Sequence, residues 1–326
     1  MGRHIARAII PSVVSPSSAP SKPAAANAYL LLTLTPLLWS ISWILGRGLA
    51  SDIPPMAMTF FRWLFSALIL APFAWPTLRR DWPLVRRHWK ALLFLAAVGI
   101  ALHNGLAYLG LNYTTATNGV ILNSFIPVMI VALSWLFLRD PLSVGQMIGL
   151  GISLTGVLAI LSQGSIDTLL AFRLNGGDLV IILSMAMWAI YTICLRWQPP
   201  GMHAYTLLFV LICLGVACVF PFFVAEALWV RTMAFTPANL GALLTVALFS
   251  SVLAYIFWNR GVEQIGANVA GLFVHLMPVY GVVLAWMFLG ESLALYHLVG
   301  ISLILVGIWI TSRSGRRPVP APAPID

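Results

Sequence analysis

Charged residues are scarce in this chain. Of its 326 residues only 8% are Asp, Glu, Lys or Arg, whereas 60% are hydrophobic. A soluble globular domain carries roughly 25% charged residues. The composition therefore excludes a water-soluble fold and leaves room for about ten membrane spans of roughly 20 residues each.

Cysteine is also rare. The chain has three cysteines, Cys194, Cys213 and Cys218, and all lie in apolar segments. An odd number at this spacing makes neither a disulfide framework nor a metal site. We interpret them as small packing residues and expect no metal and no cofactor.

Acidic side chains are missing from the interior of the predicted spans. The nine acids fall at helix ends, in loops or at the terminus: Asp52, Asp81, Asp140, Asp167, Asp178, Glu226, Glu263, Glu291 and Asp326. This distribution disfavours a buried carboxylate that exchanges protons for a cationic drug, and equally a carboxylate-built sodium site. HExxH and GxSxG motifs are absent too, so we expect no catalytic residues and no enzyme activity.

Long apolar runs take the place of these features. They predict an all-α membrane protein of ten transmembrane helices, at residues 27–49, 56–76, 89–111, 118–138, 143–162, 177–197, 203–226, 238–259, 266–289 and 293–312. We expect two repeats, 27–162 and 177–312. The flanking segments 1–26 and 313–326, rich in Pro and Ala, are predicted to be cytoplasmic tails, the first of them disordered.

The basic residues orient these spans. Fourteen of the 18 lie in alternate gaps and in both tails, while the opposite gaps hold only Arg47, Arg173 and Arg231. The positive-inside rule then predicts that both termini are cytoplasmic, with the protein in the lipid bilayer of the inner (plasma) membrane. Because the net charge of +9 is spread over the gaps rather than clustered on one face, we expect no nucleic-acid partner. A monomer is expected.

The second half of the chain repeats the first. At an offset of 151 residues the matched pairs are Gly110 with Gly261, Pro127 with Pro278, Trp135 with Trp286, Asp140 with Glu291, Gly149 with Gly300, and Gly156 with Gly307. At an offset of 149, Trp39 meets Trp188. Five helices per copy is an odd number, so the second copy enters the membrane from the opposite side. Inverted repeats place a transported substrate near the midplane between them.

The repeated segments IPVMIVALSWLFLRDPLS and MPVYGVVLAWMFLGESLA, with a Gly-rich helix after each, resemble the drug/metabolite transporter superfamily in its ten-helix EamA-type form. The resemblance covers about residues 27 to 312. Within the superfamily the chain looks most like the YddG-type exporters of aromatic and other neutral amino acids. The resemblance implies an exporter of a small molecule.

Polar side chains inside the spans are the candidates for binding, because in a membrane they face a cavity or a partner helix. Central tryptophans join them, since membrane tryptophans usually lie at the interfaces. The substrate-binding candidates are Trp39, His103, Asn104, Tyr108, Asn123, Ser124, Trp188, Ser251, Tyr255 and His275. In the repeat alignment Ser124 falls on His275 and Asn104 on Tyr255. Two alternatives remain: the polar groups only link helices, or tryptophan is simply abundant here.

Three further features stay open at this point. Arg62, inside the second span, either binds a substrate carboxylate or snorkels to the outer surface. His103 and His275 are the groups that would carry protons if transport is proton-coupled, whereas a facilitated exporter needs none. Pro127 and Pro278 remove backbone hydrogen bonds in mid-helix and are predicted to act as gating hinges.

These patterns together predict a secondary transporter that exports small neutral metabolites, amino acids including aromatic ones, by alternating access at a midplane cavity. An exporter of drugs, vitamins or other flat aromatic metabolites, with or without proton coupling, is the main alternative. A receptor that transports nothing would leave the matched polar positions without a purpose.

Overall fold

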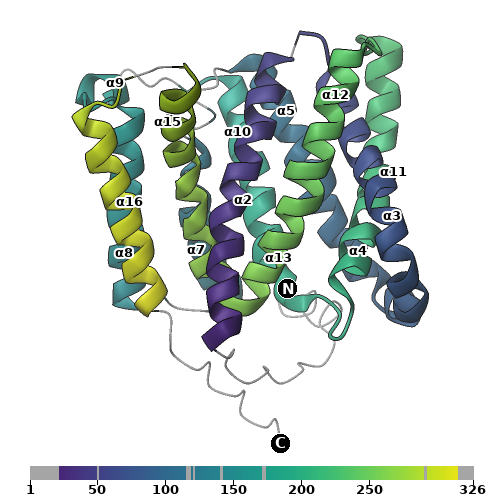
Figure 1. Cartoon of the computed structure of the whole chain (residues 1–326). Coiled ribbons are helices and arrows are strands. Elements are labelled where there is room, and N and C mark those ends of the chain that lie inside the picture. The colour runs from purple at the N-terminus through teal and green to yellow at the C-terminus, as the bar shows by residue number, and fades with distance from the viewer. Residues whose placement is uncertain are drawn as a thin grey trace, which may run out of the picture.

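The computed structural model describes residues 22–49, 51–114, 119, 122–139, 142–170, 174–289 and 292–314. Every regular element in these ranges is a helix (Figure 1). The first repeat contains α2 (Lys22–Gly48), α3 (Pro55–Arg87), α4 (Trp89–Ala96), η1 (Ala97–Leu102), α5 (His103–Tyr113), α7 (Ile126–Leu138) and α8 (Val144–Leu161). The short helix α9 (Ile166–Leu170) follows.

The second repeat has the same order of spans. It consists of α10 (Gly176–Cys194), η2 (Leu195–Trp197), α11 (Ala204–Trp229), α12 (Pro237–Thr245), η3 (Val246–Leu253), α13 (Ala254–Ile265), α14 (Ala267–Leu272), η4 (Phe273–His275), α15 (Leu276–Leu289) and α16 (Leu295–Ser314). Compared with the described residues of the first repeat, it has the short elements η2, α14 and η4 in addition. In both repeats the third span is an α–π–α run, and the last is a single helix, α8 or α16.

Length and apolar composition identify the spans. Eight helical stretches among the described residues are long and apolar enough to cross a membrane, and α7 is a shorter apolar helix. With the 27-residue α2, they occupy the positions of the ten predicted spans. The prediction of an all-α membrane protein with two repeats is confirmed, while ten crossings remain a prediction.

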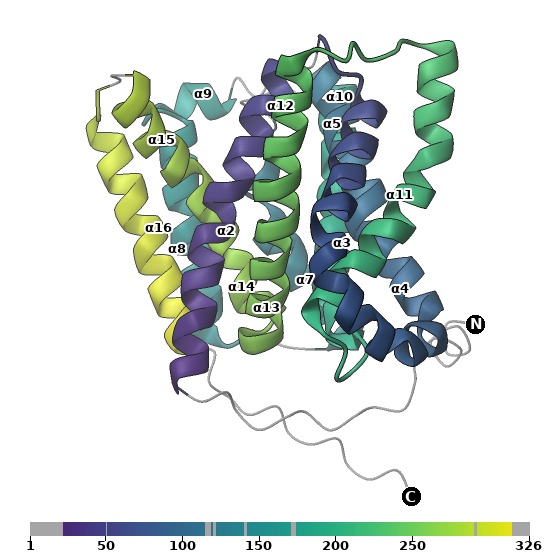
Figure 2. The ribbon, with the colours of Figure 1, turned by 45° about the vertical axis from the view of Figure 1, so that its right-hand side comes forward.

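The fifth helices of the two repeats, α8 and α16, cross in opposite directions. A Cβ atom on Gly149 would lie 2.6 Å from the carbonyl oxygen of Gly307, and one on Gly156 would lie 2.6 Å from that of Gly300. Such close contact leaves room for hydrogen only. In the sequence repeat Gly149 pairs with Gly300 and Gly156 with Gly307, so equivalent helices run antiparallel and the repeats are inverted. The pair stands at one edge of the bundle (Figures 1 and 2).

Equivalent contacts also hold the centre of the bundle together. Gly110 of α5 packs against Ile181 of α10, and its repeat partner Gly261 of α13 packs against Leu32 of α2. Leu32 and Ile181 are themselves 149 residues apart. A pseudo-twofold axis therefore relates the two halves and passes between α2, α5, α10 and α13.

Two antiparallel helices, α3 and α11, cap each other. The Glu226 carboxylate at the end of α11 accepts hydrogen bonds from the backbone N–H groups of Met56 (3.1 Å) and Ala57 (2.8 Å) at the start of α3. Asp81, near the end of α3, accepts one from the N–H of His203 (2.7 Å), the residue before α11. Each acid thus occupies the positive end of the other helix dipole.

Three predicted boundaries are wrong. The second helix was predicted to end at residue 76, but α3 continues to Arg87. Its Pro72, Pro76 and Pro83 are exposed, so their rings crowd no neighbouring helix, and Asp81 anchors the extension to α11. The predicted disordered tail 1–26 is also too long, because α2 begins at Lys22. The helix predicted over 238–259 runs on to Ile265, where Gly266 at φ 83° ends it.

The two prolines that match in the repeat alignment also lie at other helix positions than predicted. Pro127 is the second residue of α7 and Pro278 the third residue of α15, so neither lies in mid-helix. Proline is well tolerated in a first helical turn, where its missing N–H would have no intrahelical acceptor. The span that contains α7 was predicted to start at residue 118, which lies outside the described residues. Asp140 and Glu291, a pair in the repeat alignment, also lie outside them.

Candidate functional site

Aromatic rings from both repeats meet at the centre of the bundle. Trp39 of α2 contacts Trp188 of α10 edge-to-face, with ring centroids 5.1 Å apart. Trp258 lies 5.1 Å from Trp39, and Tyr255 lies 5.3 Å from Trp188. Edge-to-face and tilted pairs at these distances are favourable, so the predicted central tryptophans form one cluster.

Beside this cluster, Asn104 forms a hydrogen bond with Tyr255, the residue that it matches in the repeat alignment. Its side-chain N–H group donates to the Tyr255 hydroxyl at 3.1 Å, and that hydroxyl donates to the Gly99 carbonyl at 3.0 Å. Gly99 lies within the π-helical η1, and π-helical turns recur at functional sites. The second repeat carries its own π segment, η3, at the equivalent place, since residues 97–102 shifted by 151 become 248–253.

Arg62 of α3 is the most consequential polar residue of the site. It is 3% exposed, so the alternative that it snorkels to the surface is wrong. Its Nε donates to the Ser251 hydroxyl at 2.9 Å, and its Nη1 donates to Asn104 Oδ1 at 3.0 Å and to the Tyr108 hydroxyl at 2.8 Å. These bonds connect α3 with α5 of its own repeat and with η3 of the other.

His103 connects α5 with α10. Its Nδ1 lies 3.0 Å from the Ser184 carbonyl oxygen, and the Ser184 hydroxyl donates to the His103 carbonyl at 2.7 Å. Nδ1 is therefore the protonated nitrogen, and Nε2 is an acceptor with no partner among the described residues. The imidazole also lies 4.9 Å from the Trp188 ring.

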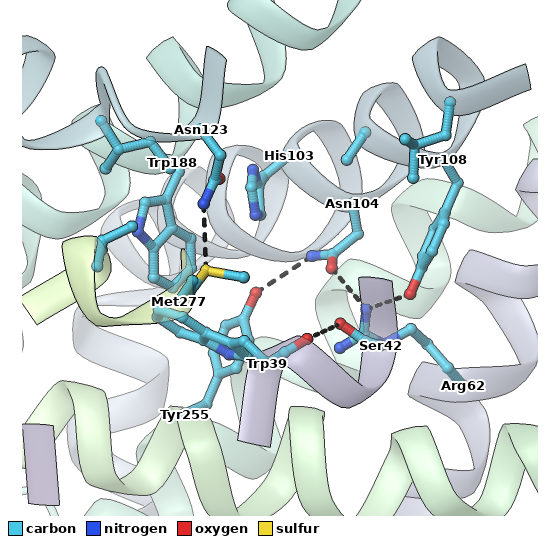
Figure 3. Close-up of a pocket in the computed structure, with 14 residues that line it drawn as sticks. Trp39, Ser42, Arg62, His103, Asn104, Tyr108, Asn123, Trp188, Tyr255 and Met277 are labelled. Carbon is cyan, nitrogen blue, oxygen red and sulfur yellow. Dashed lines mark hydrogen bonds between the residues drawn. The ribbon is translucent and has the colours of Figure 1, made fainter. Parts of the chain in front are cut away.

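A cavity opens between these side chains (Figure 3). Its lining residues are Trp39, Ser42, Arg62, His103, Asn104, Ala107, Tyr108, Leu111, Asn123, Ile126, Trp188, Tyr255, Val274 and Met277. It holds about 50 Å³ of space for the centres of water-sized molecules. A single water needs roughly 10–15 Å³ on this measure, so the cavity has room for a few waters in this conformation.

Seven of the ten predicted binding residues line this cavity: Trp39, His103, Asn104, Tyr108, Asn123, Trp188 and Tyr255. Ser124, Ser251 and His275 do not. Ser251 is not a lining residue, but its hydroxyl accepts the hydrogen bond from Arg62 Nε. His275 is fully buried between the Ser153 hydroxyl, 2.6 Å from Nδ1, and the Ser124 carbonyl, 2.9 Å from Nε2.

The sequence missed several lining residues. Ser42 and Met277 were not singled out, and Arg62 was left undecided. Met277 accepts a hydrogen bond through its sulfur from Asn123 at 3.1 Å, which joins the two repeats across the cavity (Figure 3). A methionine in an apolar run does not stand out in the sequence. A lone arginine inside a span does, because ionisable residues within the membrane usually belong to a functional site.

The electrostatics of the cavity rest on one charge. Among the described residues that line it, none is acidic, and Arg62 is the only permanent cation. Arg80 and Asp81 form an ion pair at 2.8 Å, but it lies far along α3 from the site. Burying an ion costs several kcal/mol when no opposite charge compensates it, so Arg62 is retained at an energetic disadvantage.

No group of three His, Cys, Asp or Glu side chains among the described residues is arranged to hold a metal ion. Cys194 is buried, Cys218 half-buried and Cys213 exposed. Exposure of Cys213 on an apolar helix in a bilayer means contact with lipid.

A buried aromatic and polar cavity at the interface of inverted repeats is the arrangement of a membrane transporter. The sequence model of the EamA-like transporter family matches residues 26–162 and 175–313, one match in each half. This chain belongs to the EamA-like transporter family. The predicted membership of the drug/metabolite transporter superfamily is thereby confirmed.

Relatives of this EamA-like transporter carry consistent descriptions. The uncharacterized transporter YyaM of Bacillus subtilis is 29% identical over 232 residues, which cover 69% of this chain and 74% of YyaM. An uncharacterized transporter of Archaeoglobus fulgidus is 26% identical over 292 residues, covering 88% and 97%. A crystal structure at 16% identity has a TM-score of 0.73 and covers 90% of this chain and 98% of its own, which shows the shared fold.

Proposed function

We propose that this membrane transporter exports small neutral metabolites, amino acids with aromatic side chains among them, by alternating access. The observation that carries the proposal is the composition of the cavity. Its walls are the rings of Trp39, Trp188 and Tyr255, and its polar groups come from both repeats. Apolar walls with a few placed polar groups are typical of small-molecule sites.

Alternating access follows from the inverted symmetry, because each half can adopt the conformation of the other. The small cavity volume corresponds to a closed arrangement, since ligand pockets generally measure about 300–1,000 Å³. Opening then requires helices to separate. We propose that they bend where α7 and α15 begin, at Pro127 and Pro278, because the chain there already departs from α-helical geometry at Phe125 and in the 3-10 segment η4.

Orientation is part of the proposal. The first residues of α2 and the last of α16 lie at one end of the bundle (Figure 1), where the Tyr29 hydroxyl donates to the Ser312 carbonyl at 3.4 Å. Exposed aromatic and basic residues gather where α3 ends and α4 begins: Trp75, Arg79, Arg80, Trp82, Arg86, Arg87, Trp89 and Lys90. Tryptophans mark a membrane–water interface, and the excess of Lys and Arg indicates that this interface is the cytoplasmic one. We therefore propose that both termini are cytoplasmic and that ten spans cross the inner membrane. A monomer remains part of the proposal.

The alternative substrate class is drugs, vitamins or other flat aromatic metabolites, with or without proton coupling. The cluster of rings in edge-to-face and tilted contact with Trp188 favours it, since aromatic rings pack well against flat ligands. His103 is the histidine that lines the cavity, so coupled transport would use its imidazole. We prefer facilitated export, which uses the substrate gradient alone.

Purified protein in liposomes tests the proposal. Vesicles preloaded with unlabelled phenylalanine, tryptophan, leucine or riboflavin are given a trace of the same labelled compound outside. We expect counterflow of the aromatic amino acids above that of protein-free vesicles, and little of riboflavin. Counterflow of riboflavin alone would favour the alternative, and none across the whole panel would contradict both substrate classes.

A further inference from the structure

The guanidinium of Arg62 is held in place by neutral acceptors only. Ser251, Asn104 and Tyr108 accept from Nε and Nη1, while Nη2 makes a single contact, with the Ser250 carbonyl at 3.4 Å. A guanidinium has five N–H donors. At least one N–H of Nη2 therefore has no acceptor among the described residues.

The positive charge of Arg62 is also unmatched. No carboxylate of the described residues lies within the 4.0 Å of an ion pair, and arginine stays protonated in proteins. The hydrogen bonds to α5 and η3 engage its donors but leave its charge uncompensated. Retention of a full charge beside a cavity is explained when an anion enters that cavity.

A second donor lies next to the first. The Tyr108 hydroxyl accepts from Arg62 Nη1 at 2.8 Å, which leaves its own proton without an acceptor among the described residues. Both side chains line the cavity (Figure 3). Arginine binds carboxylates through paired N–H groups, and Nη2 together with the Tyr108 hydroxyl offers two donors to one carboxylate.

The cavity makes no matching provision for a cation. Its lining residues include no acid, so an α-ammonium group would find neutral oxygens and aromatic faces. The charge of Arg62 would repel that ammonium at short range. An aromatic acid that lacks the amino group therefore suits this site better than an amine that lacks the carboxylate.

We propose that Arg62 is the anchor for a substrate carboxylate, and that the substrates are aromatic monocarboxylates for which an α-amino group is dispensable. This inference rests on the proposed function and defines its substrate class by the carboxylate, so that anionic aromatic acids are included beside the neutral amino acids. Aromatic amino acids belong to the class through their carboxylates. The single cation limits the substrate to one anionic group, and the rings of Trp39 and Trp188 select a flat apolar remainder.

Three ligands with the same phenyl side separate the two charges: 3-phenylpropionate has the carboxylate only, phenethylamine the amine only, and L-phenylalanine both. Thermal unfolding of the purified wild-type protein in detergent is followed with each ligand at millimolar concentration. We expect 3-phenylpropionate and phenylalanine to raise the unfolding temperature and phenethylamine to leave it unchanged. This comparison needs no variant and no flux.

Arg62→Gln and Arg62→Lys complete the experiment. We expect Arg62→Gln to abolish the shift caused by 3-phenylpropionate, and Arg62→Lys to need about tenfold more ligand, as the charge remains and the paired geometry is lost. A shift with phenethylamine equal to that with 3-phenylpropionate, or an undiminished shift in Arg62→Gln, would overturn the carboxylate anchor but leave the proposed function standing. No shift with any of the three ligands would overturn both.

Discussion

Trp39 and Trp188 occupy equivalent positions in the two repeats and contact each other edge-to-face across the pseudo-twofold axis, at 5.1 Å between ring centroids. Each ring belongs to the cavity wall. The two halves of the transporter therefore meet at the point where the substrate is proposed to bind, and separation of this pair is one way to open the cavity.

The first prediction concerns these tryptophans. Trp39→Phe and Trp188→Phe keep an aromatic face but lose area and an N–H group. An aromatic contact is worth about 0.5–1.5 kcal/mol, so each change should raise the half-saturating concentration of an aromatic substrate roughly 2- to 10-fold, as measured by counterflow. Trp135→Phe is the control, because that ring is 64% exposed and faces lipid. Equal effects in all three variants would argue against a role in binding.

The second prediction separates the two buried histidines. His275 bonds through both ring nitrogens and does not line the cavity, whereas His103 lines it and keeps Nε2 available. His275→Phe should lower the free energy of unfolding by about 1–3 kcal/mol, the cost of lost buried hydrogen bonds, with transport by the folded fraction retained. His103→Phe should lower the rate of transport per folded protein, and should lower the free energy of unfolding less than His275→Phe does.

Two measurements on the same preparations decide this contrast: the thermal unfolding midpoint in detergent, and the initial counterflow rate per folded protein. If His275→Phe removed transport from well-folded protein while His103→Phe kept it, the assignment of the two roles would be reversed.

The third prediction concerns the crossing of α8 and α16. Gly156→Leu places a side chain against the Gly300 carbonyl, and overpacking of this kind costs about 1–3 kcal/mol. Gly151 lies on the same helix, and a Cβ atom added to it would meet nothing within 4 Å. Gly151→Leu should therefore leave the unfolding temperature unchanged, while Gly156→Leu lowers it. The same midpoint for both variants would show that the crossing is not tight in the membrane.

The fourth prediction concerns the cap that Glu226 provides for α3. Glu226→Ala removes both acceptors of the first N–H groups of that helix, so we expect a loss of about 0.5–2 kcal/mol, as for other helix caps. Glu263→Ala is the matched control, since that acid is exposed and caps no helix. Thermal unfolding in detergent would measure the difference, and no difference between the two variants would speak against the cap.

The sequence predicted more of the fold than of the site. Apolar runs and the offset of 151 residues located the helices and the repeats, because a membrane span and a duplication both leave a long and regular signal. The repeat also aligned Asn104 with Tyr255, which the structure shows hydrogen-bonded to each other. The spans, the repeats and this residue pairing could all be predicted because each depends on a pattern that extends over many residues.

What the sequence could not predict depends on single contacts. The π-helical segments η1 and η3 have no composition of their own. An extra residue in a turn rotates the following residues around the helix, but in a span that is apolar on most sides this rotation leaves no visible pattern. The continuation of α3 to Arg87 is anchored by the hydrogen bond that the His203 N–H donates to Asp81, two residues far apart in sequence. The burial of Arg62 likewise depends on acceptors from other helices, which only the folded chain brings together.

Contacts between symmetry-equivalent residues have a consequence for how such a chain could arise. If the two halves were separate identical chains paired by a true twofold axis, any residue on that axis would face its own copy. Trp39 and Trp188 still satisfy that condition. Asn104 facing Tyr255, and Ser124 facing His275, do not, because here a donor meets a different acceptor. Joining the halves in one polypeptide frees each axial position to change independently, and an asymmetric binding site can then form on a symmetric frame.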